Sequence, residues 1–246
     1  MATTQTRPPA PKRPADAEPS EPAPTPGLQG AWWKWAVGLL MCYVIYGAFA
    51  VGGTVNFAGS GNSGRIVFFH VPVAILSYVC YAVAACYAIG TLRRRDLRAD
   101  AKSAIAMELG VLFCVLATIT GSLFAGVMWN SFWNWDPREI SIVIMLLLYA
   151  SYLVLRGAVS EQPETRARLS AVYVLVALIP ATFLIWVVPR LPWLQSLHPP
   201  DTLVRPQNTS ASYKAVLYPS FLAFTLLFVW LFQLRYRVWQ LVQRRN

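Results

Sequence analysis

Six apolar segments, each long enough to cross a lipid bilayer, constrain the fold of this chain more than any other feature. They run approximately over residues 31–51, 66–92, 103–127, 140–155, 169–188 and 215–234, and the fourth is the shortest. A helix needs about 20 apolar residues to cross the hydrocarbon core, where its backbone must satisfy its own hydrogen bonds. With 56% hydrophobic and 13% charged residues, the composition also departs from the soluble average. We therefore predict an all-α integral membrane bundle of six transmembrane helices.

The first 30 residues have a different character from the rest of the chain. They are rich in Pro, Ala, Thr and charge and contain no apolar stretch. Such a composition predicts a disordered tail rather than a cleavable signal peptide. Residues 31–240 are then expected to form one membrane domain.

The distribution of lysine and arginine predicts how the bundle is oriented. Most of the 21 basic residues lie in the tail, in the second-to-third and fourth-to-fifth connections, and at the C-terminus. Because basic groups near helix ends resist translocation, both termini are predicted to be cytoplasmic and the odd-numbered connections to face outward. The net charge of +10 then reflects topology and contact with anionic lipids, and binding of nucleic acid is not expected.

The three outward connections carry the most distinctive residues of the sequence. The second of them, near residues 128–139, contains Trp-Asn-Ser-Phe-Trp-Asn-Trp-Asp-Pro-Arg-Glu from Trp129 to Glu139. The only two histidines flank it: His70 in Phe-Phe-His-Val-Pro at the start of the second segment, and His198 in Ser-Leu-His-Pro-Pro. The prediction therefore places one aromatic cluster and two imidazoles on one membrane face.

Simpler interpretations account for part of this pattern. Tryptophan is enriched at membrane interfaces, which is a sufficient explanation for Trp32, Trp33, Trp35, Trp186 and Trp239. It does not explain the density of the central run or the charged residues that follow it. Two histidines are too few for a typical zinc site, and no nucleophile motif indicates a hydrolase. The four cysteines form no C-x-x-C motif, so neither a redox pair nor covalent haem attachment is indicated; we interpret them as core residues.

The combination fits the chemistry of a haem site. Low-spin haem iron takes two axial nitrogens from opposite faces of the porphyrin, and His70 and His198 can supply them. The indoles of Trp133 and Trp135 can stack on or flank the porphyrin. The propionates need cations, and the nearest outward arginines are Arg65, Arg138 and Arg190. Asp136 is expected to orient Arg138 or an indole N–H rather than to contact the ligand.

The same residues resemble a known family. The run from Trp129 to Arg138 resembles the tryptophan-rich WWD signature of the haem-handling proteins CcmC, CcmF and CcsA, and the motifs around His70 and His198 resemble their axial-histidine motifs. Six helices with a single such loop are most similar to CcmC. The resemblance implies that His70 and His198 ligate the iron, and that Trp129, Trp133, Trp135, Asp136 and Arg138 belong to the platform for haem and its chaperone.

The resemblance also implies a function in cytochrome c maturation. A CcmC-like protein holds haem b non-covalently and transiently at the outer face of the bacterial inner membrane and passes it to a CcmE-like chaperone. ATP-binding-cassette components similar to CcmAB and a small membrane protein similar to CcmD are the expected partners. The chain is then a haem-binding assembly factor rather than a self-sufficient enzyme.

Three other functions remain open at the level of sequence. Asp-Pro-Arg-Glu at positions 136–139, and Asn130 in place of a glycine, resemble the CcsA and CcmF branch, whose members act in thioether synthesis. A transmembrane haem transporter is disfavoured because ionisable residues inside the segments are scarce apart from Glu108. A b-type electron carrier would favour histidines paired inside the bundle rather than at one boundary.

Overall fold

The computed structural model describes residues 32–51, 61–198 and 210–245, and every regular element in these ranges is helical. The six long helices are α1 (Trp32–Val51), α2 (Val67–Arg94), α3 (Leu97–Trp129), α4 (Pro137–Ala158), α5 (Pro163–Thr182) and α6 (Ala211–Arg245). Three short elements accompany them: η3 (Gly61–Ile66), η4 (Phe183–Val187) and η5 (Val188–Arg190). Six helices are long and apolar enough to cross a membrane, which confirms the predicted fold class. The tail and residues 199–209 lie outside the described residues.

The observed helices begin or end at other residues than predicted. For α3 and α4 the reason is a helix cap, which an average hydropathy does not detect. Asp136 caps α4 and forms a capping box with Glu139, and Pro137 occupies the first turn, so α4 has 22 residues. Asp96 caps α3 by accepting a hydrogen bond from the Arg98 backbone N–H at 2.8 Å, so α3 begins at residue 97. Helix α6 continues to Arg245, well beyond its apolar part.

The fifth predicted helix is divided into three conformations. Helix α5 includes Pro180 and ends at Thr182, after which η4 is a π-helix and η5 is a 3-10 helix that contains Pro189. Proline lacks a backbone N–H and restricts the residue before it, which disfavours an uninterrupted α-helix here. π-helical turns often accompany functional sites. Three residues of η4, Leu184, Ile185 and Trp186, line the same cavity as His70.

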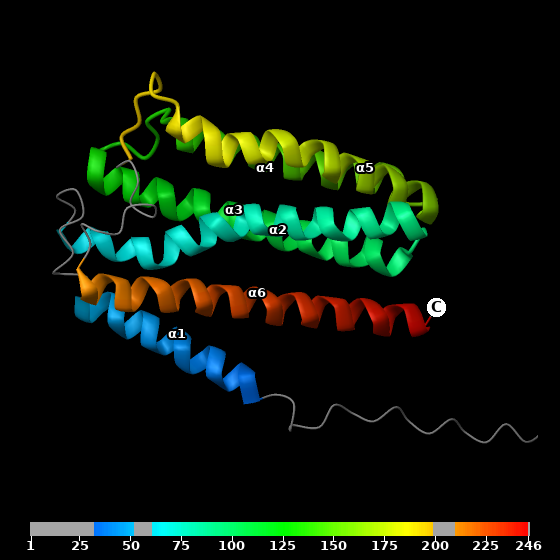
Figure 1. Cartoon of the computed structure of the whole chain (residues 1–246), viewed down its shortest axis with the longest axis horizontal. Helices are drawn as coiled ribbons and strands as arrows, with labels where there is room; N and C mark the ends of the chain where they lie inside the picture. The colour runs from blue at the N-terminus through cyan, green and yellow to red at the C-terminus, as the bar shows by residue number, and fades with distance from the viewer. Residues whose placement is uncertain (1–31, 52–60, 199–209, 246) are drawn as a thin grey trace, which may run out of the picture.

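The helices pack in layers (Figure 1). Helices α2 and α3 form the central pair, α4 and α5 cover one side, and α6 lies on the other side with α1 packed against it. The start of α2, the α3–α4 connection and the segment after η5 meet at one end of the bundle, whereas α6 ends at the opposite end. The connections predicted to share a membrane face therefore share one end of the bundle.

Ion pairs and cysteines add detail that the sequence did not provide. Asp100 of α3 and Arg156 of α4 form a bidentate ion pair, with N–O distances of 2.7 and 2.8 Å. Glu108 pairs with Arg235 of α6. Cys80 and Cys114 are buried, as expected of core residues, but Cys42 and Cys86 are exposed on the bundle surface.

Close packing between α3 and α4 depends on a glycine. The buried ring of Tyr149 crosses Gly110, and its hydroxyl donates a hydrogen bond to the carbonyl of Ser77. A Cβ at position 110 would overlap the Tyr149 hydroxyl and ring. Helices α2, α3 and α4 are thereby held together at one buried point.

We expect Gly110→Ala to lower the free energy of unfolding by about 1–3 kcal/mol, because the buried Tyr149 ring must shift to admit the methyl group. Thermal unfolding in detergent measures the effect. Gly38→Ala on α1 is the matched control, since a Cβ there meets nothing within 4 Å. Removing a helical glycine should make that control slightly more stable. Equal shifts in the two variants would contradict the packing argument.

Candidate functional site

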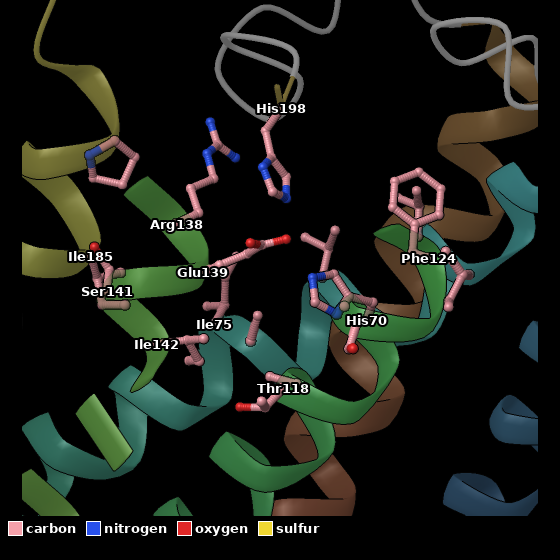
Figure 2. A pocket seen from close by; sticks show the side chains of 18 of the residues that line it. His70, Ile75, Thr118, Phe124, Arg138, Glu139, Ser141, Ile142, Ile185 and His198 are labelled. Carbon is pink, nitrogen blue, oxygen red and sulfur yellow. The ribbon is translucent and has the colours of Figure 1, made fainter. Parts of the chain in front are cut away.

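A cavity of about 240 Å³ lies at the end of the bundle where the distinctive connections meet (Figure 2). Five residues predicted from the sequence line it: His70, Trp133, Arg138, Arg190 and His198. Apolar side chains of α2, α3, α4 and η4 also line it: Ala74, Ile75, Ala117, Ile142, Leu184 and Ile185. The cavity thus combines charged and polar groups with apolar walls.

The His70 ring is held against α3. His70 lies in the first turn of α2, and its Nδ1 lies 2.9 Å from the Thr120 Oγ1. Pro72, two residues later, lies inside the helix. The backbone of Gly121 lies directly under the ring, since a Cβ at that position would come within 3.0 Å of the His70 Cε1. A polar contact and a backbone contact therefore limit how far the imidazole can turn.

The carboxylate of Asp136 organises the opposite wall. One oxygen, Oδ1, accepts a hydrogen bond from the Arg138 N–H at 2.8 Å and lies 3.0 Å from the His198 Nδ1. The other oxygen, Oδ2, accepts hydrogen bonds from the Ser196 hydroxyl at 2.8 Å and from the Leu197 N–H at 2.7 Å. The side chain of Asp136 is fully buried, so these contacts replace its hydration.

The surroundings of Asp136 keep it ionised. Burial alone would raise its pKa, but His198, the Arg138 N–H and the Ser196 hydroxyl together hold the pKa well below the ordinary value. Asp136 was expected to orient Arg138 or an indole. It does bind the Arg138 backbone, but its main additional contact is with His198 and the two residues before it.

His198 is fixed by two further contacts. Its backbone N–H donates to the Ser196 hydroxyl at 3.2 Å. Its ring packs edge-to-face on Trp129, with centroids 5.1 Å apart. Figure 2 shows the imidazoles of His70 and His198 entering the cavity from different sides, with the carboxylate of Glu139 between them in that view.

The aromatic connection between α3 and α4 is tied down by its own polar groups. Glu139 Oε2 accepts hydrogen bonds from the Asn134 N–H at 2.7 Å and from the Asp136 N–H at 3.3 Å. The Ser122 hydroxyl donates to the Phe132 carbonyl at 2.7 Å, and the Phe132 ring lies against Gly126. The connection is therefore a defined structure that fixes its tryptophans.

The three tryptophans of this connection have different environments. Trp133 lines the cavity, whereas Trp129 lies behind His198. Trp135 packs edge-to-face on Trp133 at 5.9 Å, is 74% exposed, and has a φ of 55°. A bulky residue with positive φ is an outlier that often marks a functional position. Only one of the three predicted indoles therefore forms part of the cavity wall.

The predicted arginines also separate into two groups. Arg138 and Arg190 line the cavity, and Arg190 donates a hydrogen bond to the Trp186 carbonyl at 2.8 Å with its guanidinium over the Trp186 ring. Arg65 does not line the cavity. Its guanidinium donates to the Asn62 side chain at 3.0 Å and lies over the Phe49 ring. Arg65 is therefore directed toward α1, away from the position predicted for it.

Comparison with known proteins identifies the family. The family model described as "Heme exporter protein C", CcmC, matches residues 17–246. The chain belongs to this family. It is 37% identical over 172 residues to Heme exporter protein C of Bradyrhizobium diazoefficiens, covering 69% of this chain and 64% of that one. Identity is 33% over 180 residues to the protein of the same name from Paracoccus denitrificans, with 72% and 73% coverage. A ccmC-like mitochondrial protein of cytochrome c biosynthesis from Marchantia polymorpha is 28% identical over 168 residues, with 68% of each chain covered.

Membership in the CcmC family confirms the recognition made from the WWD-like run and the two histidine motifs. Together with the six helices long and apolar enough to cross a membrane, it identifies a multi-pass membrane protein of the Heme exporter protein C family. The matched segment spans just under two thirds of the Bradyrhizobium relative.

Several cavity residues of this CcmC-family protein were missed by sequence reasoning. Trp186, interpreted as an interfacial tryptophan, lines the cavity and packs edge-to-face on Tyr78. Glu139 lines it as well. Thr120 contacts His70 but lies in the middle of an apolar segment, where a threonine attracts no notice. One sequence signal could have identified Trp186 as a cavity residue. It lies four residues before Arg190 on a helical segment, and residues at that spacing share one face of a helix.

We expect Asp136→Asn to lower the free energy of unfolding by about 3 kcal/mol or more. An amide turns one acceptor oxygen into a donor, which then faces the donors that the carboxylate binds. Each hydrogen bond to a charged group contributes about 1.5–3 kcal/mol. Unfolding in detergent measures the loss, and faster proteolysis near residues 196–198 should accompany it.

Asp96→Asn is the matched control for this change. Asp96 also caps a helix, where its side chain accepts a hydrogen bond from the Arg98 N–H, and asparagine caps helices about as well as aspartate. Its effect should stay below about 0.5 kcal/mol. If Asp136→Asn were as mild as Asp96→Asn, the network around Asp136 would not have the importance assigned to it.

Proposed function

We propose that this chain binds one haem b, non-covalently and transiently, at the outer face of the bacterial cytoplasmic membrane and presents it to a CcmE-like haem chaperone for cytochrome c maturation. The observation that carries the proposal is the meeting of His70 and His198, the only two histidines of the sequence, at one cavity. They lie 128 residues apart in the sequence, so local sequence does not explain their proximity. Membership in the CcmC family supports haem as the ligand.

The two imidazoles suit the two axial positions of haem iron. Neutral imidazole is a common ligand of haem iron, and ligands from separate segments can approach the two faces of a planar macrocycle. His70 belongs to a helix and His198 to a connection, so the two rings reach the cavity from different sides. A porphyrin between them would place its apolar edge against the walls formed by α2, α3, α4 and η4.

The charges at the cavity favour an anionic ligand. Arg138 and Arg190 are cations that can neutralise propionates with paired hydrogen bonds. Glu139 is an anion in the same cavity, but its Oε2 is engaged by two backbone N–H groups at the positive N-terminus of α4. The local charge is therefore compatible with two carboxylates.

The aromatic connection supports a role in presenting the ligand. Trp133 forms part of the cavity wall, and Trp135 and Phe132 beside it are 74% and 64% exposed. Exposed aromatic groups next to a ligand site suit contact with a protein partner. We assign this surface to the chaperone, and assign supply and release to ATP-binding-cassette components similar to CcmAB with a small CcmD-like subunit. The chain itself acts as a holder and not as a self-sufficient enzyme.

The outward orientation of the site follows from charge. Basic residues gather at the connections of the opposite end and at the C-terminus, and such residues remain cytoplasmic. Both termini are then cytoplasmic and the cavity opens toward the outer face.

One observation favours a second function. The Asp-Pro-Arg-Glu sequence that forms the capping box of α4 resembles the CcsA and CcmF branch, whose members act in thioether synthesis. The two functions differ in their product. Purified chain that attaches haem covalently to an apocytochrome c peptide without a chaperone would act as a synthetase, whereas a holder would transfer haem only to the chaperone.

Substitution of either histidine tests the proposal. His70→Gly and His198→Gly should each remove the bis-imidazole absorption spectrum of the haem-loaded protein and reduce haem occupancy by roughly tenfold or more. Added imidazole should restore the spectrum in both variants, because it can occupy the vacated position. Rescue separates loss of a ligand from loss of folding. Retention of the original spectrum by both variants without imidazole would refute the assignment.

The arginines provide a second test of the geometry. We expect Arg138→Ala or Arg190→Ala to weaken haem retention by about tenfold, because each removes a cation from the cavity. Arg65→Ala should have a much smaller effect, since that side chain faces Asn62 and Phe49. Competition with a soluble haem-binding protein measures retention. A larger loss with Arg65→Ala than with either cavity arginine would contradict the assignment of the propionates.

A further inference from the structure

The two cavity histidines differ in the group that faces their Nδ1 atoms. The Nδ1 of His70 lies 2.9 Å from the hydroxyl of Thr120, which is neutral. The Nδ1 of His198 lies 3.0 Å from the carboxylate of Asp136, which is anionic. If both rings ligate one iron, as the proposed function holds, this difference bears on how strongly each is bound.

The hydrogen bonds of Thr120 determine where the His70 proton lies. The Thr120 hydroxyl lies 2.7 Å from the Leu116 carbonyl and 3.3 Å from the Ala117 carbonyl. Carbonyl oxygens only accept, and a hydroxyl has a single proton to donate, so that proton is directed to the backbone. The Thr120 oxygen must therefore accept from His70, which places a proton on the His70 Nδ1 and leaves the lone pair on Nε2.

Gly121 keeps the ring in this arrangement. A Cβ at position 121 would lie 3.0 Å from the His70 Cε1 and 3.7 Å from each ring nitrogen. The Cε1 edge of the ring therefore rests on the α3 backbone next to its hydrogen bond with Thr120. The bond and the contact together define one orientation of His70 and one tautomer.

The partner of a ligating imidazole adjusts its strength as a ligand. An acceptor on the distal N–H increases the basicity of the ligating nitrogen. The Asp136 carboxylate is an anion 3.0 Å from the His198 Nδ1, so it stabilises positive charge on that ring more strongly than the neutral Thr120 hydroxyl does on the His70 ring. The imidazole beside Asp136 is thus the stronger donor to iron, and the imidazole hydrogen-bonded to Thr120 is the weaker.

We infer that Thr120 is a positioning residue that fixes the ligating tautomer of His70 and makes His70 the axial ligand that dissociates first when haem leaves. Thr120 itself has no contact with the ligand in this proposal. It acts through the imidazole by holding the proton on the nitrogen that does not bind iron. The departing haem would then remain attached to His198 until a partner takes the vacated position.

Carbon monoxide provides a direct probe of the weaker ligand. It binds ferrous haem at one axial position, so in a six-coordinate site its binding rate at saturating concentration reports dissociation of the more labile ligand. The full-length chain, purified in detergent and loaded with haem, is reduced and mixed with CO. We expect Thr120→Val to raise this rate about tenfold or more, as for other losses of a partner of a metal-bound histidine.

Two companion variants separate positioning from packing. Thr120→Ser keeps the hydroxyl and should retain the original rate. Thr91→Val is the matched control. Thr91 is also a helical threonine whose hydroxyl donates to the carbonyl four residues earlier, at 3.1 Å to Tyr87, but it lies at the end of α2 opposite to His70. The reduction potential of the haem should rise in Thr120→Val, because a less basic imidazole stabilises ferric iron less, and should not change in Thr91→Val.

The outcomes distinguish this inference from the proposed function. A chain that never forms a bis-imidazole haem complex would overturn the function and the inference together. A normal complex whose CO rate and potential are unaffected by Thr120→Val would overturn the inference alone. An increase in the CO rate with Asp136→Asn but not with Thr120→Val would identify His198 as the labile ligand and also overturn it. If Thr120→Val does not fold, Gly121→Ala displaces the same ring and is expected to raise the CO rate.

Discussion

The buried carboxylate of Asp136 connects the helical bundle to the segment that bears His198. On one side it caps α4, and on the other it binds the Ser196 hydroxyl, the Leu197 N–H and the His198 ring. Burying an ionised carboxylate costs free energy unless hydrogen-bond donors surround it. The donors that compensate this cost are therefore held in fixed positions around Asp136. The position of the His198 imidazole thus depends on the contacts of the buried Asp136 carboxylate as well as on the Trp129 ring packed against it.

The features predicted correctly depended on properties that act over long stretches of sequence. Six apolar runs specified six helices, because a bilayer requires that length and that composition wherever a chain crosses it. Alternation of the connections then brought His70, the aromatic run and His198 to one end, whatever the detailed packing. Helix ends were less accurate. The capping box at Asp136 and Glu139 and the polar extension of α6 depend on single residues that average hydropathy conceals.

Contacts between helices could not be predicted from the sequence. Arg65 is five residues from His70, yet the turn of η3 directs it to Phe49, while the more distant Arg190 reaches the cavity. Trp186 was predicted to lie at the membrane interface. In the structure it belongs to the π-helical turn η4 and lines the cavity. Thr120 illustrates the general limit. Its role depends on which residue of another helix faces it, which no local pattern in α3 records.

The two histidines differ both in expected strength as iron ligands and in the mobility of the segment that bears them. His70 lies on a long helix and is held by a neutral hydroxyl, whereas His198 lies on a connection and is held by an anion. Mobility alone would favour dissociation of His198, but three contacts of Asp136, to Ser196, Leu197 and His198, anchor that connection. Ligand strength is then the remaining difference, and it favours release at His70. A protein that must retain haem and also surrender it benefits from this asymmetry, since one bond can open while the other keeps the porphyrin in place.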